Sequence, residues 1–230
     1  MKGWQKTSFI DYPDKIASVF FFGGCNFRCA FCHNPELVLK PESLPDINDG
    51  EVLSYLETKK HLYEGVCVSG GEPTLYPDLE DILIKIKALD LLVKLDTNGT
   101  QPDKVKRWVE AKLIDYVAMD IKTSPTLYKQ VFPLGLNHEG LWSRISETIE
   151  FLKDDNVPYE FRSTLYPPFF PREEWGAIKA LVAGAPAYYL QPFNSKVTLA
   201  KETKRLSIKE EEIMEMRDYF AQAVGKCEIR

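Results

Sequence analysis

The segment Cys25-Asn26-Phe27-Arg28-Cys29-Ala30-Phe31-Cys32 places three cysteines within eight residues, with three and then two residues between them. It follows the apolar run 16–22, which ends in Gly23-Gly24, and it precedes a turn at Asn34-Pro35. Thiolates bind soft metals and hold iron–sulfur clusters. A four-iron cluster normally takes four protein ligands, so three neighbouring cysteines would leave one iron for another group. The sequence therefore predicts a metal site in a loop that follows a strand.

Two other interpretations of the cysteines are open at this point. Zinc accepts three thiolates and one imidazole, which His33 would supply, but structural zinc sites usually split their ligands into two separated pairs. A disulfide framework is less favoured, because five cysteines in 230 residues are few and odd in number and we expect no secretory signal. Cys67 lies within an apolar strand and is interpreted as a small core residue. Cys227 has no partner nearby in the sequence. Because two remaining cysteines cannot fully ligate a second cluster, we predict a single cluster.

The composition is ordinary for a soluble globular protein, with 44% hydrophobic and 27% charged residues. A chain of this length forms one large α/β domain or two small ones. The net charge of −5 argues against a nucleic-acid-binding surface. The apolar stretch 19–22 is too short to span a bilayer or to act as a signal sequence. We expect a cytoplasmic protein without a nucleic-acid or membrane partner.

Apolar strand-like runs alternate with amphipathic helical patterns along the chain. A short strand or hairpin with a turn at Pro13-Asp14 is expected over 2–15. Strands are predicted at 16–22, 65–69, 91–95, 116–121, 159–165 and 187–191. Helices are predicted at 50–61, capped by Asp49, and at 78–89, 102–112, 139–152, 173–182 and 208–224.

Six strands alternating with six helices imply a parallel sheet with right-handed crossovers. Eight such units would close a full barrel, so six would leave it open along one side. We therefore predict an α/β fold with a partial (β/α)6 TIM-like barrel. It is expected to form a single domain over 1–230, with an N-terminal extension at 1–15, barrel elements at 16–194 and a C-terminal helix within 195–230.

Polar side chains stand where three predicted strands end, which is where parallel α/β folds bind ligands. The strand 65–69 is followed by Gly70-Gly71-Glu72-Pro73, whose glycines allow close backbone approach, although a simple tight turn is the alternative. Asp96 and Thr97 follow 91–95, and a local turn is again the alternative. Asp120 interrupts an apolar run and needs a cation or donors, and Lys122 shares its face.

Four further positions are weaker candidates. Arg162 and Thr164 alternate with apolar neighbours along 159–165 and share a face that would line the barrel, unless that face meets solvent. Asn194 follows the last strand. His33 is interpreted as structural, or as a donor near the metal site, rather than as a ligand.

The cysteine spacing, Phe31 before the last cysteine and the Gly-Gly-Glu-Pro segment together resemble the radical S-adenosylmethionine (SAM) enzymes. This resemblance implies a partial six-unit barrel. It also implies one [4Fe-4S] cluster on Cys25, Cys29 and Cys32, with SAM bound to the fourth iron. Phe31 would pack near the adenine, and Gly70, Gly71, Glu72 and Pro73 would bind the SAM amino group.

Asp96, Thr97, Asp120 and Lys122 match positions of the glycyl-radical activating branch of that family. There the aspartates contribute to a monovalent cation site beside the SAM carboxylate, and the lysine contacts SAM. Related activating enzymes often have a histidine near the place of Asn194, directed at the SAM ribose. This sequence departs from that pattern, which puts the role of Asn194 in doubt.

Residues 5–13, together with 24–29 and Cys-His-Asn-Pro-Glu-Leu at 32–37, resemble anaerobic ribonucleoside-triphosphate reductase activating proteins. The resemblance implies an oxidoreductase that cleaves SAM reductively and takes a hydrogen from a glycine Cα to form a glycyl radical in the reductase. It also implies an electron donor such as flavodoxin or ferredoxin. Tyr166–Pro171 is our candidate for the contact with the partner, although it would equally pack on its own domain.

Three rival functions remain open. An activator of pyruvate formate-lyase, or of another glycyl-radical enzyme, would share nearly all of these residues. A small-molecule radical SAM enzyme, such as a deazaguanine-pathway synthase, would share the cluster and SAM motifs but would need a closed substrate pocket. A non-catalytic electron carrier would need the cluster alone, and the polar residues at the strand ends would then have no purpose.

Overall fold

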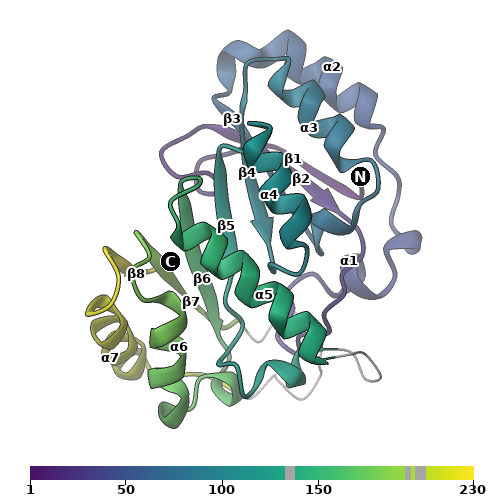
Figure 1. The fold of residues 1–230 in the computed structure, drawn as a ribbon. Coiled ribbons are helices and arrows are strands. Elements are labelled where there is room, and N and C mark those ends of the chain that lie inside the picture. Colours follow the sequence, from purple (N-terminus) through teal and green to yellow (C-terminus); the bar gives the residue numbers. More distant parts are fainter. Residues whose placement is uncertain (133–137, 195–197, 200–205) are drawn as a thin grey trace.

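Eight strands form one curved sheet in sequential order, from β1 at one edge to β8 at the other, in the computed structural model of the chain (Figure 1). The structure describes residues 1–132, 138–194, 198–199 and 206–230. β1 pairs antiparallel with β2, and the later neighbours pair in parallel. The strands are β1 (Gly3–Ser8), β2 (Ala17–Phe22), β3 (Gly65–Gly70), β4 (Leu92–Thr97), β5 (Tyr116–Asp120), β6 (Tyr159–Leu165), β7 (Tyr188–Pro192) and β8 (Cys227–Ile229).

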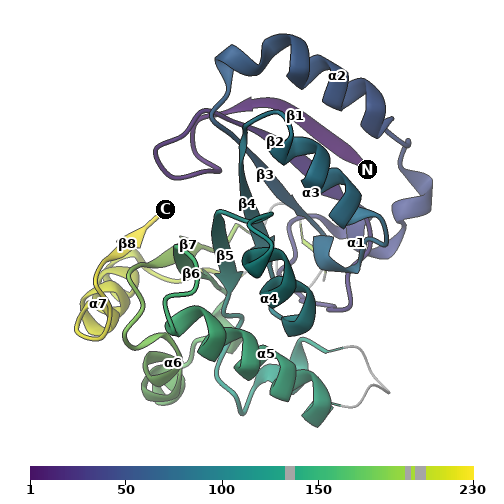
Figure 2. The same ribbon diagram turned by 45° about the horizontal axis from the view of Figure 1, so that its top comes forward.

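The helices lie on the outer face of this sheet, as Figures 1 and 2 show. Most of them connect one parallel strand to the next, as expected for βα units. The α-helices are α1 (Pro35–Leu39), α2 (Asp49–Lys59), α3 (Leu79–Lys87), α4 (Pro102–Glu110), α5 (His138–Lys153), α6 (Trp175–Val182) and α7 (Glu210–Ala221). None of the helices within the described ranges is long and apolar enough to cross a membrane.

The sheet is open along one side. Within the residues that the structure describes, β1 and β8 occupy opposite edges and do not pair with each other. The six parallel strands β2–β7 are the six strands predicted from the apolar runs. The structure thus confirms the α/β fold with a partial, TIM-like barrel open on one side.

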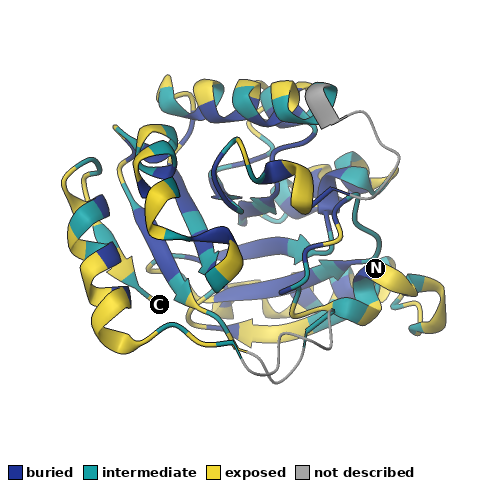
Figure 3. Ribbon diagram, turned by 90° about the horizontal axis from the view of Figure 1, so that it is seen from below, coloured by how far each residue is buried: buried dark blue, intermediate teal, exposed yellow. Residues whose placement is uncertain are grey.

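The hydrophobic core lies between the sheet and its helices. On β4, Val93 and Leu95 are fully buried and belong to this core, whereas Lys94 between them faces the barrel interior. On α3, the predicted apolar stripe is buried: Leu79, Ile82, Leu83 and Ile86. Figure 3 shows the consequence, with dark blue strands in the centre and exposed helix surfaces facing outward. The inner face of the sheet is left for polar side chains.

One local prediction was wrong, and one strand was missed. The side chain of Asn48, not Asp49, caps α2 by accepting hydrogen bonds from the backbone of Gly50 and Glu51. Asp49 is helical and its carboxylate instead binds the N-terminal ammonium at 2.9 Å. The strand β8 was not predicted, because three residues are too short for a periodic pattern and only pairing with β7 defines them. Residues 195–197 and 200–205, part of the expected C-terminal segment, lie outside the described residues.

The stripe on α3 gives a test of the core. We expect Leu83→Ala to lower the free energy of unfolding by about 2–5 kcal/mol, because Leu83 is fully buried and its loss leaves a cavity. Ile84→Ala on the same helix is the matched control: Ile84 is 49% exposed, so its loss should be within about 1 kcal/mol. Anaerobic urea unfolding measures both, and equal losses would contradict this placement of the core.

Candidate active site

A pocket at the carboxyl ends of the barrel strands collects nearly all of the site residues that the sequence singled out. They come from the loop after β2 and from the ends of β3, β4 and β5, segments that are far apart in the sequence but whose ends meet because the strands are parallel. The predicted residues that line it are Cys25, Cys29, Phe31, Cys32, Gly70, Gly71, Glu72, Pro73, Asp96, Thr97, Asp120 and Lys122.

The three cysteines of the loop are free thiols that face this pocket. Backbone hydrogen bonds from Gly24 to Leu37 and from Cys32 to Cys29 shape the loop. Burial raises the pKa of Cys25 to about 12 and that of Cys29 to about 11. Burial thus favours the protonated thiols of Cys25 and Cys29, and a bound metal would have to stabilise their thiolates.

The geometry of the loop bears on the kind of metal. Among the described residues, no group of three or more His, Cys, Asp or Glu side chains could hold a single metal ion. The described residues thus offer no compact site of three cysteines and His33 for zinc. An iron–sulfur cluster bonds each thiolate to a different iron, so its ligands need not converge on one point. Three thiols that face one pocket, with Cys29 buried and Cys25 and Cys32 half-buried, fit such a cluster.

The Gly-Gly-Glu-Pro segment is tied directly to the cysteine loop. The backbone N–H of Gly71 donates to the carbonyl of Phe22 at 2.9 Å, and the N–H of Glu72 donates to the carbonyl of Gly24 at 2.8 Å. A Cβ at Gly70 would clash with the backbone of Phe22, and one at Gly71 would clash with the Gly24 carbonyl. Gly70 also has a φ of +130°. The glycines are thus required for close contact between two strand ends.

The carboxylate of Glu72 joins the ends of β3 and β4. Its side chain is only 1% exposed. It accepts hydrogen bonds from the hydroxyl of Thr97 at 2.9 Å and from the backbone N–H of Asn98 at 2.7 Å, and the backbone N–H of Thr74 donates to it at 3.2 Å. Burial raises its pKa, although these donors oppose the shift. Both carboxylate oxygens are therefore bonded to protein groups, and Glu72 positions the neighbouring strand end.

A cluster of paired charges lies in and beside the pocket, and among its members only Lys94 is buried whereas the others are half-buried. Arg162 on β6 donates from Nη1 to Asp96 and from Nε to Asp120, each at 3.2 Å. Lys122 contacts Asp120 at 2.9 Å, and the buried Lys94 contacts Asp96. Burial alone would raise the pKa of Asp96, but Arg162 and Lys94 hold it at about 2. Burial would likewise lower the pKa of Lys122, but Asp120 raises it.

This charge cluster settles three sequence interpretations. Asp96 and Asp120 face the interior and are paired with cations, so Asp96 is not a mere turn residue. Arg162 and Thr164 line the barrel rather than meeting bulk solvent. Cys67 is fully buried as predicted, but its sulfur lies 3.8 Å from Nζ of Lys94 and so faces the polar interior.

Aromatic side chains form the wall beside the cysteine loop. The ring of Phe31 lies 5.4 Å from that of Tyr166 and 5.6 Å from that of Phe169, centroid to centroid. Tyr166, Phe169 and Phe170 are all buried. The segment 166–171, our candidate for partner contact, therefore directs its aromatic rings into its own domain, and Pro168 is its exposed residue.

Asn194 is the predicted site residue that does not line the pocket. Its backbone carbonyl instead lies 3.2 Å from Nε2 of His33, whose ring stacks on Phe193. His33 therefore links the cysteine loop to the end of β7, in agreement with a structural role. The expectation for Asn194 came from the resemblance to activating enzymes, which often have a histidine near this place, and it stays a prediction.

Sequence reasoning missed other lining residues, among them Gln191 and Asn98. Gln191 lies on β7 at the position that alternation with Leu190 would have assigned to the interior, so the strand pattern contained a signal. Asn98 donates its side-chain amide to Asn26 at 2.9 Å and approaches the sulfur of Cys25 at 4.0 Å. Nothing in its local sequence indicates this contact, which depends on the approach of β4 to the cysteine loop.

Residues 19–183 match the model of the radical SAM superfamily. The chain belongs to this superfamily, whose members bind a [4Fe-4S] cluster and SAM. Over its whole length it is 33% identical to the "Putative glycyl-radical enzyme activating enzyme MJ1227" of Methanocaldococcus jannaschii, of which it covers 95%. It thereby groups with the glycyl-radical enzyme activating enzymes.

Other matches are partial. The chain is 32% identical to the pyruvate formate-lyase-activating enzyme of Clostridium pasteurianum over 51% of its length and 50% of that enzyme. It is 34% identical to the 7-carboxy-7-deazaguanine synthase of Methanothermobacter thermautotrophicus, over 44% of its length and 39% of that protein. Among solved structures, SuiB of Streptococcus suis shares the fold, with a TM-score of 0.68 and 14% identity over 91% of this chain and 48% of SuiB.

The close contact at Gly70 can be tested by comparing two glycines of positive φ. We expect Gly70→Ala to destabilise the protein by more than about 3 kcal/mol, because backbone strain adds to a clash with Phe22. Gly184→Ala is the matched control: its φ is +82° but no atom lies within 4 Å of the added Cβ, so only about 1 kcal/mol is expected. Thermal unfolding of both variants measures the difference, and equal losses would rule out the clash.

Proposed function

We propose that this protein activates an anaerobic ribonucleotide reductase by generating a glycyl radical in it. The observation that carries this proposal is the joining of the cysteine loop to the Gly-Gly-Glu-Pro turn, through the bonds of Gly71 and Glu72, around one pocket. Cys25, Cys29 and Cys32 would hold the cluster. When bound, the cluster and SAM supply the chemistry, in which one electron cleaves SAM and a hydrogen atom is removed from the Cα of a glycine.

The residues of the chain would bind and orient SAM. Lys122 and Arg162 bring positive charge to the pocket, which suits the carboxylate of the methionine part. Phe31 provides an apolar surface suited to the adenine, supported from behind by Tyr166 and Phe169. Because the Glu72 carboxylate is bonded to Thr97 and Asn98, we assign recognition of the SAM amino group to the backbone of Gly70 and Gly71.

The choice of partner is supported by sequence and shape. The segments 5–13 and 32–37 resemble reductase activating proteins. The barrel is open on one side between β1 and β8, which would admit a glycine-bearing loop. An acidic flavodoxin or a ferredoxin would supply the electron. The proposed location is the cytoplasm, where thiols stay reduced.

A second candidate is favoured by the partial match to a deazaguanine-pathway synthase, and a third by the match to a pyruvate formate-lyase-activating enzyme. The synthase would require a pocket closed around a small molecule. An electron carrier is disfavoured, because it would leave the half-buried charges of Asp120, Lys122 and Arg162 without a use, and partial desolvation of such charges is costly.

The cluster ligands can be tested by iron analysis after anaerobic reconstitution. We expect about four irons and four sulfides per chain, and we expect each of Cys25→Ala, Cys29→Ala and Cys32→Ala to lose them. Cys67→Ala and Cys227→Ala are matched controls, since neither residue lines the pocket, and both should retain the cluster. Stoichiometric zinc in the native protein, or a cluster retained in the first three variants, would contradict the assignment.

Radical transfer tests the function itself. Reduced protein, SAM and the candidate reductase are mixed anaerobically, and electron paramagnetic resonance should show a glycyl doublet on the reductase. Reductase deuterated at the glycine Cα should pass deuterium into 5′-deoxyadenosine. The Cys29→Ala variant is the negative control. If SAM is cleaved but the radical forms on pyruvate formate-lyase, or a small molecule is transformed instead, the corresponding rival function replaces this one.

A further inference from the structure

The position between Asp96 and Asp120, where the family resemblance places a monovalent cation, is held by an arginine of this chain. Arg162 lies directly beside Asp120 in the register of β5 and β6. Its side chain reaches across the inner face of β5, and its guanidinium bonds Asp120 through Nε and Asp96 through Nη1, at 3.2 Å each. One guanidinium therefore bridges the two carboxylates that the cation would bridge.

The other oxygens of the expected cation ligands are also engaged. The second oxygen of Asp120 pairs with Lys122, and the carboxylate of Asp96 also contacts Lys94 and accepts from the hydroxyl of Ser69 at 3.0 Å. The hydroxyl of Thr97 donates to Glu72 and accepts from the N–H of Gly99 at 3.1 Å. A hard cation would have to displace several of these donors to collect its oxygen ligands.

The charge balance points the same way. Lys94, Lys122 and Arg162 face two carboxylates, so the cluster already carries one positive charge in excess. Glu160, further along β6, is compensated separately by Arg230 at 3.2 Å and by the hydroxyl of Tyr116. Glu72 is bonded to neutral donors. A further cation would be repelled, whereas an anionic carboxylate would be attracted.

We propose that Arg162 takes the place of the monovalent cation, so that this pocket binds the SAM carboxylate without any added Na⁺ or K⁺. The inference rests on the proposed function, because it takes the pocket as the SAM site. It replaces the expectation that Asp96 and Asp120 contribute to a monovalent cation site. The guanidinium acts as a built-in positive charge whose occupancy does not depend on the salt around the protein.

The test measures SAM affinity of the cluster-loaded protein by equilibrium dialysis in NaCl, KCl or tetramethylammonium chloride. Equal ionic strength keeps screening constant, so that only the identity of the cation changes. We expect the dissociation constant of the native protein for SAM to differ by less than about twofold among the three salts. Loss of a charged partner would instead weaken SAM binding roughly tenfold. A loss of about tenfold or more in tetramethylammonium, restored saturably by Na⁺ or K⁺, would overturn the proposal.

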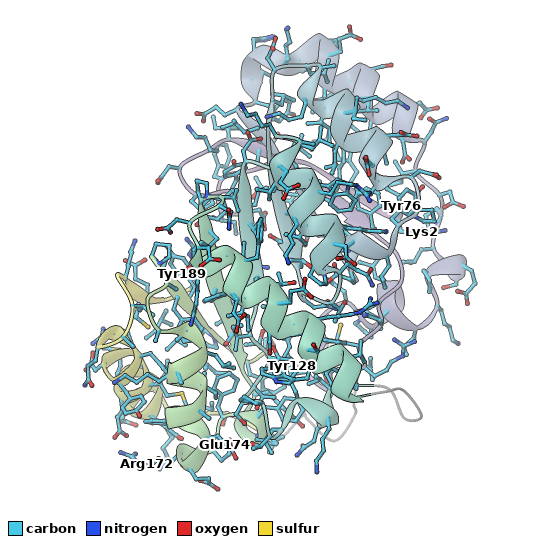
Figure 4. The ribbon with its side chains drawn as sticks, in the orientation of Figure 1. Lys2, Tyr76, Tyr128, Arg172, Glu174 and Tyr189 are labelled. Carbon is cyan, nitrogen blue, oxygen red and sulfur yellow. The ribbon has the colours of Figure 1, made fainter. Side chains whose placement is uncertain are left out.

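A variant without the Arg162 guanidinium should bind SAM with an affinity that depends on the added cation. In tetramethylammonium, Arg162→Ala should bind SAM about ten- to a hundredfold more weakly, and Na⁺, K⁺ or free guanidinium should restore part of the affinity. Native affinity of Arg162→Ala in all three salts would also overturn the proposal. Arg172→Ala is the matched control, because this exposed arginine lies beside α6 (Figure 4) and does not line the pocket. It pairs with Glu215 of α7.

The outcomes separate this inference from the proposed function. If native, cluster-loaded protein binds no SAM in any salt, the assignment of the pocket fails. If it binds SAM only with Na⁺ or K⁺, the pocket stands and the role of Arg162 fails. Circular dichroism and iron content show whether Arg162→Ala folds and holds the cluster. If it does not, the comparison of the three salts on the native protein still decides the matter.

Discussion

Two backbone hydrogen bonds, from Gly71 to Phe22 and from Glu72 to Gly24, fix the end of β3 against the start of the cysteine loop. These two bonds can form because β2 and β3 pair in parallel, so that their carboxyl ends lie side by side. Because neither Gly70 nor Gly71 has room for a side chain, the two chain segments meet backbone to backbone. The buried Glu72 extends this contact to the end of β4 through Thr97 and Asn98. The cysteines and the strand ends therefore form one structural unit, and the pocket takes its shape from it.

The interior of the barrel is polar because each strand has two faces with different neighbours. The outer face packs on helices and is apolar, as Val93 and Leu95 show. The interior of an open six-unit barrel is too narrow to hold a helix. Here the inner face of the sheet carries charged side chains: Lys94, Asp96, Asp120 and Arg162. Burying these charges is costly, so their mutual pairing is what makes the arrangement tolerable. The same pairing fixes the charge that a ligand at the strand ends would meet.

Much of the site could be predicted from the sequence, because its parts are local. The spacing of Cys25, Cys29 and Cys32 and the Gly-Gly-Glu-Pro segment are each complete within a few residues. The inward orientation of Asp120, Lys122 and Arg162 followed from strand alternation. Alternation says which face a side chain occupies but not which groups oppose it, so the bridging of two aspartates by Arg162 was not foreseen. Likewise, the sequence did not indicate that the backbone carbonyl of Asn194 lies beside His33, 161 residues away in the chain.

The sequence by itself determined the order of strands and helices, the presence of a three-cysteine loop and the face on which each strand residue lies, because hydrophobic periodicity and motif spacing are properties of neighbouring residues. Only the tertiary structure decided the bridging of Asp96 and Asp120 by Arg162, the pairing of β8 with β7 and the packing of the 166–171 aromatics on Phe31. These features depend on contacts between segments more than 20 residues apart, such as the 66 residues that separate Asp96 from Arg162. Such contacts form only when the sheet has curved and brought its strand ends together.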